Sequence, residues 1–383
     1  MVGDGVHDDG GMCVASGGGD VSNFESGDSC FYDKELAKVK SFYFKKIREF
    51  FDEHDFLEVE VPCMTPTVDP EPAMHHFGTV FDGMYGGVSG GMSAVLSEAS
   101  SDGKRPMYLV TSPEFQMKKL LGAGFGNIYT LARVFRNGEG GGGRHNPEFT
   151  MLEWYRVGAG YNEMMDDTEA LIKWLIDQPG LENFPGLKNL SRGEKWDRKS
   201  LNELFIEYCG INLNENREVE QLKKAAVNNA SGVVYDTNAC ETWDDVMYKI
   251  FLNHIEPKLG FERPVFVYDY PASQAALAKK KVDDLFWAER FELYINGNEL
   301  CNGFSELTDS VEQRKRFEEQ NLVRKKEGRT TFPVDEEFLS SLESIHLPCG
   351  GNALGTDRLL KVLLGKERIE DVMLFPFEKM LKL

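Results

Sequence analysis

Residues 148–157 combine side chains that could bind both a purine ring and an amine. If this stretch is a β-strand, its period of two places four residues on one face: Phe149, Met151, Glu153 and Tyr155. An aromatic ring, a carboxylate and a phenol would then lie side by side. Ordinary core packing with a structurally paired glutamate would produce the same pattern, so this stretch alone leaves both interpretations open.

A second strand-like segment, residues 291–302, supports the catalytic interpretation. Asn296-Gly297 is the strongest short signal for a hairpin, and a two-residue loop places Tyr294 opposite Glu299. Glu292 and Glu299 then share one face of the sheet. Two carboxylates without a neighbouring histidine or thiol suit Mg²⁺ shared with substrate phosphates rather than zinc. A solvated strand face is the alternative.

The signatures of common phosphate-binding loops are missing. The sequence contains no G-x-x-x-x-G-K-[ST] loop, and residues 122–126 do not complete a G-x-G-x-x-G pattern. A long polar loop at 136–147 exceeds the about two to five residues that are usual for hairpins, which suggests function. An ATP site would therefore hold the triphosphate with magnesium and arginines, for which the candidates are Arg136, Arg144 and Arg358.

The elements that would position these residues follow from periodicity. Apolar residues at helical spacing predict a helix from about 35 to 55, and helical patterns fill most of 162–256. A further helix begins near Pro113. Strands are predicted at 56–61, 107–111, 265–269 and 286–302, and on both sides of the loop 136–147. This arrangement in blocks predicts an α+β domain with an antiparallel sheet flanked by helices.

The domain organisation follows from composition. Residues 1–30 are rich in Gly, Asp and Ser, so we expect a disordered tail. Residues 31–383 are expected to form one catalytic domain. Within it, 82–104 is predicted to be a surface insertion and 160–260 a mainly helical region.

Charge and cysteine content narrow the class of protein. The formal net charge of −20 disfavours extensive contact with RNA, although Lys279-Lys280-Lys281 is a local basic cluster. Seven scattered cysteines without a C-x-x-C pair predict reduced thiols. No apolar stretch is long enough to span a membrane. We therefore expect a cytoplasmic protein.

Three ordered segments resemble the class II aminoacyl-tRNA synthetase core, in its lysyl branch. FLEVEVP at 56–62 looks like motif 1, RVFRN with RHNPEFTMLEWY within 133–155 looks like motif 2, and ALGTDR at 353–358 looks like motif 3. NGFSELTD at 302–309 resembles the lysyl signature. The resemblance implies an ATP-using, adenylate-forming ligase with that family's catalytic fold.

The resemblance also implies roles for individual residues. Arg136 and Arg358 would be catalytic. ATP would be bound by Arg136, Asn137, Glu139, His145, Phe149, Asn302 and Arg358, and Mg²⁺ by Glu292 and Glu299. The amino-acid substrate would be bound by Ser112, Glu114, Glu153, Tyr155, Asn302, Glu306 and Ala353.

Within the branch, the sequence is most similar to truncated members that attach (R)-β-lysine to a lysine of translation elongation factor P. The sequence resembles those members at 151–155, 270–277 and 288–292. In addition, Ala353 is at the position where tRNA synthetases have glycine. Only a short tail precedes motif 1, in place of an N-terminal OB-fold. We therefore expect no such fold and little or no recognition of a tRNA anticodon.

Other interpretations remain open. Either lysine or (R)-β-lysine fits the resemblance. A minimal lysyl-tRNA synthetase-like enzyme that charges tRNA or another amine is the alternative ligase. A non-enzymatic regulator is the third possibility, against which the retained arginines and metal carboxylates argue. The family implies a homodimer, but Asp55 replaces the usual motif 1 glycine and could weaken that contact. The four glycines at 140–143 also leave the role of Glu139 open.

Overall fold

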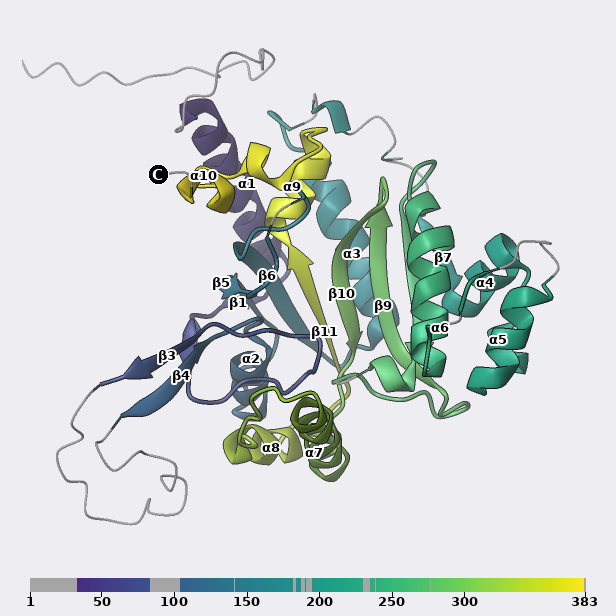
Figure 1. The fold of residues 1–383 in the computed structure, drawn as a ribbon. Helices are drawn as coiled ribbons and strands as arrows, with labels where there is room; N and C mark the ends of the chain where they lie inside the picture. The colour runs from purple at the N-terminus through teal and green to yellow at the C-terminus, as the bar shows by residue number, and fades with distance from the viewer. Residues whose placement is uncertain are drawn as a thin grey trace, which may run out of the picture.

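A central sheet of eight strands organises the protein in the computed structural model (Figure 1). The structure describes residues 33–381 except for 83–103, 141, 182–183, 187–189, 191–194, 230–234, 238 and 276. The predicted tail 1–30 and almost all of the predicted insertion 82–104 lie outside the described residues.

The strand order of the sheet is β1-β5-β6-β11-β10-β9-β8-β7. The bounds are β1 (Leu57–Glu58), β5 (Ile128–Phe135), β6 (Glu148–Val157), β7 (Asp197–Ser200), β8 (Val265–Pro271), β9 (Trp287–Ile295), β10 (Asn298–Ser305) and β11 (Cys349–Gly355). The six inner strands pair antiparallel, as predicted, whereas the edge strands β1 and β7 pair parallel to their neighbours. A smaller sheet contains β2 (Met64–Thr65), β3 (Gly78–Phe81) and β4 (Arg105–Leu109).

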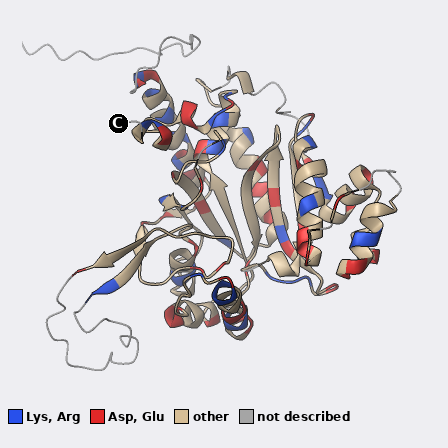
Figure 2. Cartoon of the chain, in the orientation of Figure 1, with Lys and Arg blue, Asp and Glu red and all other residues tan. Residues whose placement is uncertain are grey.

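Helices surround this sheet (Figure 1). Their bounds are α1 (Lys34–Glu53), α2 (Glu114–Gly122), α3 (Tyr161–Ile176), α4 (Leu201–Cys209), α5 (Val219–Val227), α6 (Trp243–Ile250), α7 (Ser310–Lys326), α8 (Glu336–Glu343), α9 (Thr356–Leu363) and α10 (Phe377–Met380). None of the described helices combines the length and apolar character that a membrane span needs. Figure 2 shows acidic and basic positions mixed along outer helices such as α7.

The main core lies between one face of the sheet and helices α1, α3 and α9. Asp33 caps α1 by accepting hydrogen bonds from the backbone of its first turn, and this helix buries Tyr43 and Ile47. Trp154 of β6 and Phe291 of β9 join the same cluster. Because neighbouring residues of a strand point to opposite faces, burying these aromatic rings turns the intervening side chains to the other face.

One segment is shorter than predicted, and another forms a strand that was not predicted. The strand predicted at 56–61 is reduced to the two residues of β1, which pair only with β5 at the edge of the sheet. The glycine-rich segment at the start of the motif 3 region, for which no element was predicted, forms β11 in the middle of the sheet. An added Cβ at Gly350 would lie 2.5 Å from Met164 Cγ of α3. The glycines therefore permit close packing of helix on strand.

Candidate active site

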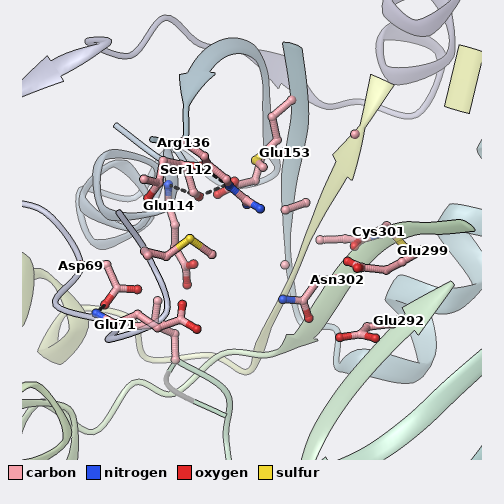
Figure 3. Close-up of a pocket in the computed structure, with 18 of the residues that line it drawn as sticks. Asp69, Glu71, Ser112, Glu114, Arg136, Glu153, Glu292, Glu299, Cys301 and Asn302 are labelled. Carbon is pink, nitrogen blue, oxygen red and sulfur yellow. Dashed lines mark hydrogen bonds between the residues drawn. The ribbon is translucent and has the colours of Figure 1, made fainter. Parts of the chain in front are cut away.

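A cavity of about 400 Å³ lies over the other face of the sheet, where most of the predicted site residues converge (Figure 3). The predicted residues that line it are Ser112, Glu114, Arg136, Glu139, Arg144, His145, Phe149, Glu153, Tyr155, Glu292, Glu299, Asn302, Glu306, Ala353 and Arg358. Asn137 is not among them, because it is exposed and its backbone N–H donates to His75 O at 2.9 Å.

Strand register explains how distant segments meet in this cavity. Ala353 of β11 lies opposite Glu153 of β6 and also opposite Asn302 of β10, which in turn faces Glu292 of β9. These four residues form a row across four adjacent strands. Residues directly opposite one another point to the same face, so the row presents all four side chains to the cavity. Ala353 is small and leaves the middle of the row open.

A β-bulge places a further carboxylate beside this row. Tyr294 lies opposite Glu299, as the hairpin predicts, but the register shifts between Glu299 and Cys301. In a regular strand, Glu299 and Asn302 would face opposite sides, since they are three residues apart. The extra residue of the bulge lets both face the cavity.

Glu153 is the centre of a buried network at one end of the cavity. It accepts hydrogen bonds from Tyr155 OH at 2.6 Å and from Ser112 Oγ at 2.8 Å. Burial, together with the nearby Glu114, raises the pKa of Glu153 to about 8. The carboxyl group is thus held ready for a cation, because its charged form lacks a cationic partner within hydrogen-bond distance among the described residues.

Sequence reasoning missed the lysine behind this network. Lys118 Nζ lies 2.6 Å from Glu114 Oε1 and 2.5 Å from Glu306 Oε2, and the lysine is fully buried. Burial raises the pKa of Glu306, although Lys118 opposes the shift. The i,i+4 spacing of Glu114 and Lys118 on a predicted helix was the available signal.

The opposite end of the cavity is basic and more open. Arg136 Cζ lies 5.4 Å from the ring centroid of Phe149. Arg358 Nη1 donates to Glu299 O at 2.6 Å and lies 3.8 Å from that residue's carboxylate. Burial and the neighbouring Arg358 lower the pKa of His145, which favours the neutral imidazole. This end can accept a polyanion.

The pair Glu292 and Glu299 fits a divalent cation shared with phosphates. Burial and the charge of Glu292 raise the pKa of Glu299, a repulsion that a cation would relieve. Glu292 accepts hydrogen bonds from Arg290, Tyr270 and Tyr294, each at 2.6 Å, and these fix its orientation. Carboxylate oxygens are hard ligands, which Mg²⁺ prefers. Sequence reasoning missed the three donors, two of which lie two residues from Glu292 on its own strand.

Two other missed carboxylates, Asp69 and Glu71, reach the cavity from the loop after β2 (Figure 3). Burial and Glu71 raise the pKa of Asp69. Arg324 anchors the loop by donating to Glu71 O at 3.1 Å and to Met74 O at 3.2 Å. The sequence held no signal for them, because an irregular loop has no period from which a facing direction could be predicted.

The basic cluster predicted as a possible nucleic-acid contact is largely neutralised. Lys280 pairs with Glu312 at 2.9 Å, and Lys281 pairs with Asp269 at 2.6 Å. Exposed lysines bind phosphates best when their charge is not already paired. The cluster therefore offers less positive charge than its sequence indicates.

The antiparallel sheet, its loop between β5 and β6 and its row of site residues define the catalytic core of a class II synthetase. The chain matches the family "tRNA synthetases class II (D, K and N)" over residues 33–379, and it belongs to this family. The protein is an ATP-dependent, adenylate-forming ligase.

Three similar relatives, matched along almost their whole length, carry the same name. The chain is 38% identical to the elongation factor P--(R)-beta-lysine ligase of Vibrio cholerae over 342 residues, which cover 89% of this chain and 95% of the relative. It is 39% identical to the enzyme of that name from Proteus mirabilis over 340 residues, covering 89% and 93%. For the one from Yersinia enterocolitica the values are 38% over 331 residues, covering 86% and 91%.

Proposed function

We propose that the protein activates lysine or (R)-β-lysine with ATP and transfers it to a lysine ε-amine of translation elongation factor P. The supporting observation is that one cavity joins a buried acidic end to a basic end. Glu153 anchors the acidic end, and Arg136 with Arg358 supply the basic end. The acceptor is inferred from the relatives named as elongation factor P ligases.

The acidic end would hold the substrate's amino groups. A buried ammonium needs carboxylate partners to offset its desolvation, and three carboxylates surround this end: Glu114, Glu153 and Glu306. Tyr155 and Ser112 fix Glu153 in position. Asn302, next to Ala353 in the row, would hold the substrate carboxylate.

In the first step, the substrate carboxylate would attack the α-phosphorus of ATP and release pyrophosphate. Phe149 would stack on adenine, while Arg136 would bind the α-phosphate and Arg358 the γ-phosphate. His145 and Glu139, which also line the cavity, are the further proposed ATP contacts. Mg²⁺ held by Glu292 and Glu299 would supply charge neutralisation between phosphates. The contribution of the arginines is positioning and electrostatic stabilisation, without a covalent enzyme intermediate.

In the second step, the acceptor amine attacks the carbonyl carbon of the adenylate. An amide bond forms, AMP leaves, and the nitrogen loses its proton. A deprotonated amine is needed for attack. The cavity would exclude water from the adenylate while the acceptor lysine enters.

The test is intact-mass analysis of purified elongation factor P after incubation with this protein, ATP, magnesium and either lysine isomer. We expect a mass increase of one lysyl unit. Purified tRNA, tested in parallel for aminoacylation, addresses the alternative acceptor. Pyrophosphate release without labelling of elongation factor P would move the proposal to another amine. No pyrophosphate release with either isomer would overturn it.

A further inference from the structure

The buried Lys118 joins two carboxylates that come from separate parts of the chain. Glu114 is on α2, like Lys118, whereas Glu306 follows β10. A fully buried ammonium is costly to desolvate and is tolerated only with close anionic partners. Here both partners line the cavity, whereas Lys118 does not. Lys118 therefore acts from behind the cavity wall.

The closest contact of each carboxylate with the lysine involves one oxygen. Glu114 uses Oε1 and Glu306 uses Oε2. Both oxygens of Glu306 are buried without a geometrically regular hydrogen bond among the described residues, and only Oε2 has the ion-pair contact with Lys118 that is given above. A buried carboxylate oxygen without a partner costs free energy unless something else binds it. Glu306 is part of the cavity lining, so a ligand bound in the cavity lies beside this carboxyl group.

Gly351 and Phe304 pack closely against the ion pair of Glu306 and Lys118. A Cβ added to Gly351 would overlap Glu306 Oε1 and lie 2.6 Å from Tyr155 Cε1. The ring centroid of Phe304 lies 5.4 Å from Lys118 Nζ, and Phe304 lines the cavity. The glycine leaves room for the oxygen, and the aromatic ring packs near the lysine while it also lines the cavity.

Charge balance explains why a fixed cation is needed at this end. Carboxylates this close together resist simultaneous ionisation, so without a counter-ion some would take up protons and stop accepting hydrogen bonds. The titratable groups that interact with Lys118 or its two partners are Glu114, Glu306, Glu153, Tyr155, Asp69, Glu71 and Cys349. Lys118 is the cation that contacts two of them directly.

We propose that Lys118 is a positioning residue of the amine-binding end. Its ammonium stabilises the charged form of Glu306 and, through its contacts with Glu114 and Glu306, fixes both carboxyl groups beside the substrate ammonium. The cavity thereby selects an amino acid with a cationic side chain over one with a neutral side chain. The inference deepens the proposed function and rests on it for the identity of the amine substrate.

The experiment compares Lys118→Met and Lys118→Gln with Lys119→Met as a matched control. Lys119 is on the same helix and also pairs with two carboxylates, Asp335 at 2.9 Å and Glu337 at 2.8 Å, but it does not line or support the cavity. The assay is amino-acid-dependent pyrophosphate exchange from about pH 7 to 9, with separate KM values for ATP and for the lysine isomers.

In both Lys118 variants we expect KM for the amino acid to rise roughly 30-fold at neutral pH, because an ammonium loses an ionised partner. The value of kcat and KM for ATP stay within a few-fold, and the excess in KM shrinks towards higher pH as the carboxylates ionise. Norleucine lacks the side-chain amine, and we expect the variants to prefer lysine over norleucine less strongly than the wild-type protein does. The Lys119 variant keeps the wild-type values.

A purely structural role predicts a different result. Then kcat and both KM values change together, without pH dependence, or neither Lys118 variant folds while Lys119→Met does. Either result would overturn the proposal. If wild-type protein is inactive with both isomers, the proposed function fails but Lys118 is still tested by unfolding. Without Lys118, the folded carboxylates should bind more protons than they do in the wild type. The free energy of unfolding should then fall more steeply as pH rises from about 5 to 8. An unchanged slope would refute the idea.

Discussion

The two ends of the cavity differ in how tightly their charges are held. At the amine end, Lys118 is fully buried and its carboxylate contacts are 2.5 and 2.6 Å long. At the nucleotide end, the side chains of Arg136 and Arg358 are each 25% exposed, and their carboxylate neighbours lie at 3.8 Å. The amine end is therefore preorganised before its ligand binds, whereas the arginines of the nucleotide end stay available for a ligand.

The physical reason lies in the ligands. A triphosphate carries enough charge to draw partly exposed arginines into place, and bidentate contacts then form with it. An alkylammonium brings a single charge into a dry pocket, so its carboxylate partners must already be oriented. We therefore expect substitutions at the two ends to separate the KM values for ATP and for the amino acid.

The largest effect is expected at the nucleotide end. Arg136→Ala should lower kcat for pyrophosphate exchange by about 10²–10³, as for the loss of one preorganised donor to a developing charge. The melting temperature should hardly change, because this side chain is partly exposed. The control is Arg133→Ala, three residues earlier in β5, whose side chain is 54% exposed. Equal losses in both variants would contradict the assigned role.

The next effect separates the amine end from the nucleotide end. Gly351→Ala should raise KM for lysine by about 10-fold or more and destabilise the fold by about 1–3 kcal/mol, because the added Cβ overlaps Glu306 and crowds Tyr155. KM for ATP should stay unchanged in steady-state assays. Gly355→Ala is the matched control, since its nearest neighbours would lie at 3.6 and 3.9 Å. A rise in KM for ATP as large as that for lysine would argue against separate ends.

Glu153 should give the amine end a pH dependence. Its pKa is raised to about 8 in the folded protein, so the folded state keeps a proton that the unfolded chain releases above about pH 4.3. Stability should therefore fall as pH rises between these values, by up to about 1.4 kcal/mol per pH unit. Glu153→Gln should flatten this slope in chemical unfolding measured at several pH values, whereas the exposed Glu53→Gln should leave it as in the wild type. A steeper slope in Glu153→Gln would contradict the raised pKa.

The smallest effect concerns a position outside both ends. Asp55 follows α1 with a φ of +59°, in the left-handed region that favours glycine. Asp55→Gly should stabilise the fold by at most about 1 kcal/mol, as measured by denaturant unfolding, and should change neither KM value. A loss of stability would show that the aspartate side chain compensates for its backbone conformation. The homodimer implied by the family stays a prediction.

Much of the site was predictable because its signals are local. Alternation along 148–157 indicated the common face of Glu153 and Tyr155, and both line the cavity. The Asn296-Gly297 turn predicted the pairing of Tyr294 with Glu299, which the register confirms. Strand period and turn chemistry act over a few residues, so they can be interpreted without knowledge of the rest of the chain.

The missed features depend on contacts between distant segments. The bulge after Glu299 has no local signature, and it decides that Asn302 faces the cavity. Lys118 resembles a helix-surface lysine in the sequence, but Glu306, which follows β10, makes it part of a buried cluster. Glycines at 350 and 351 disfavour an isolated strand, yet they occupy the centre of the sheet.

By itself, the sequence determined the α+β class, the family and the face of β6 that carries Glu153 and Tyr155. Only the tertiary structure decided that Glu153, Ala353, Asn302 and Glu292 form one row and that Lys118 lies behind it. The reason is that periodicity specifies direction within a segment. Register between segments is set instead by packing of the opposite, apolar face against the helices, where Trp154 and Phe291 are buried.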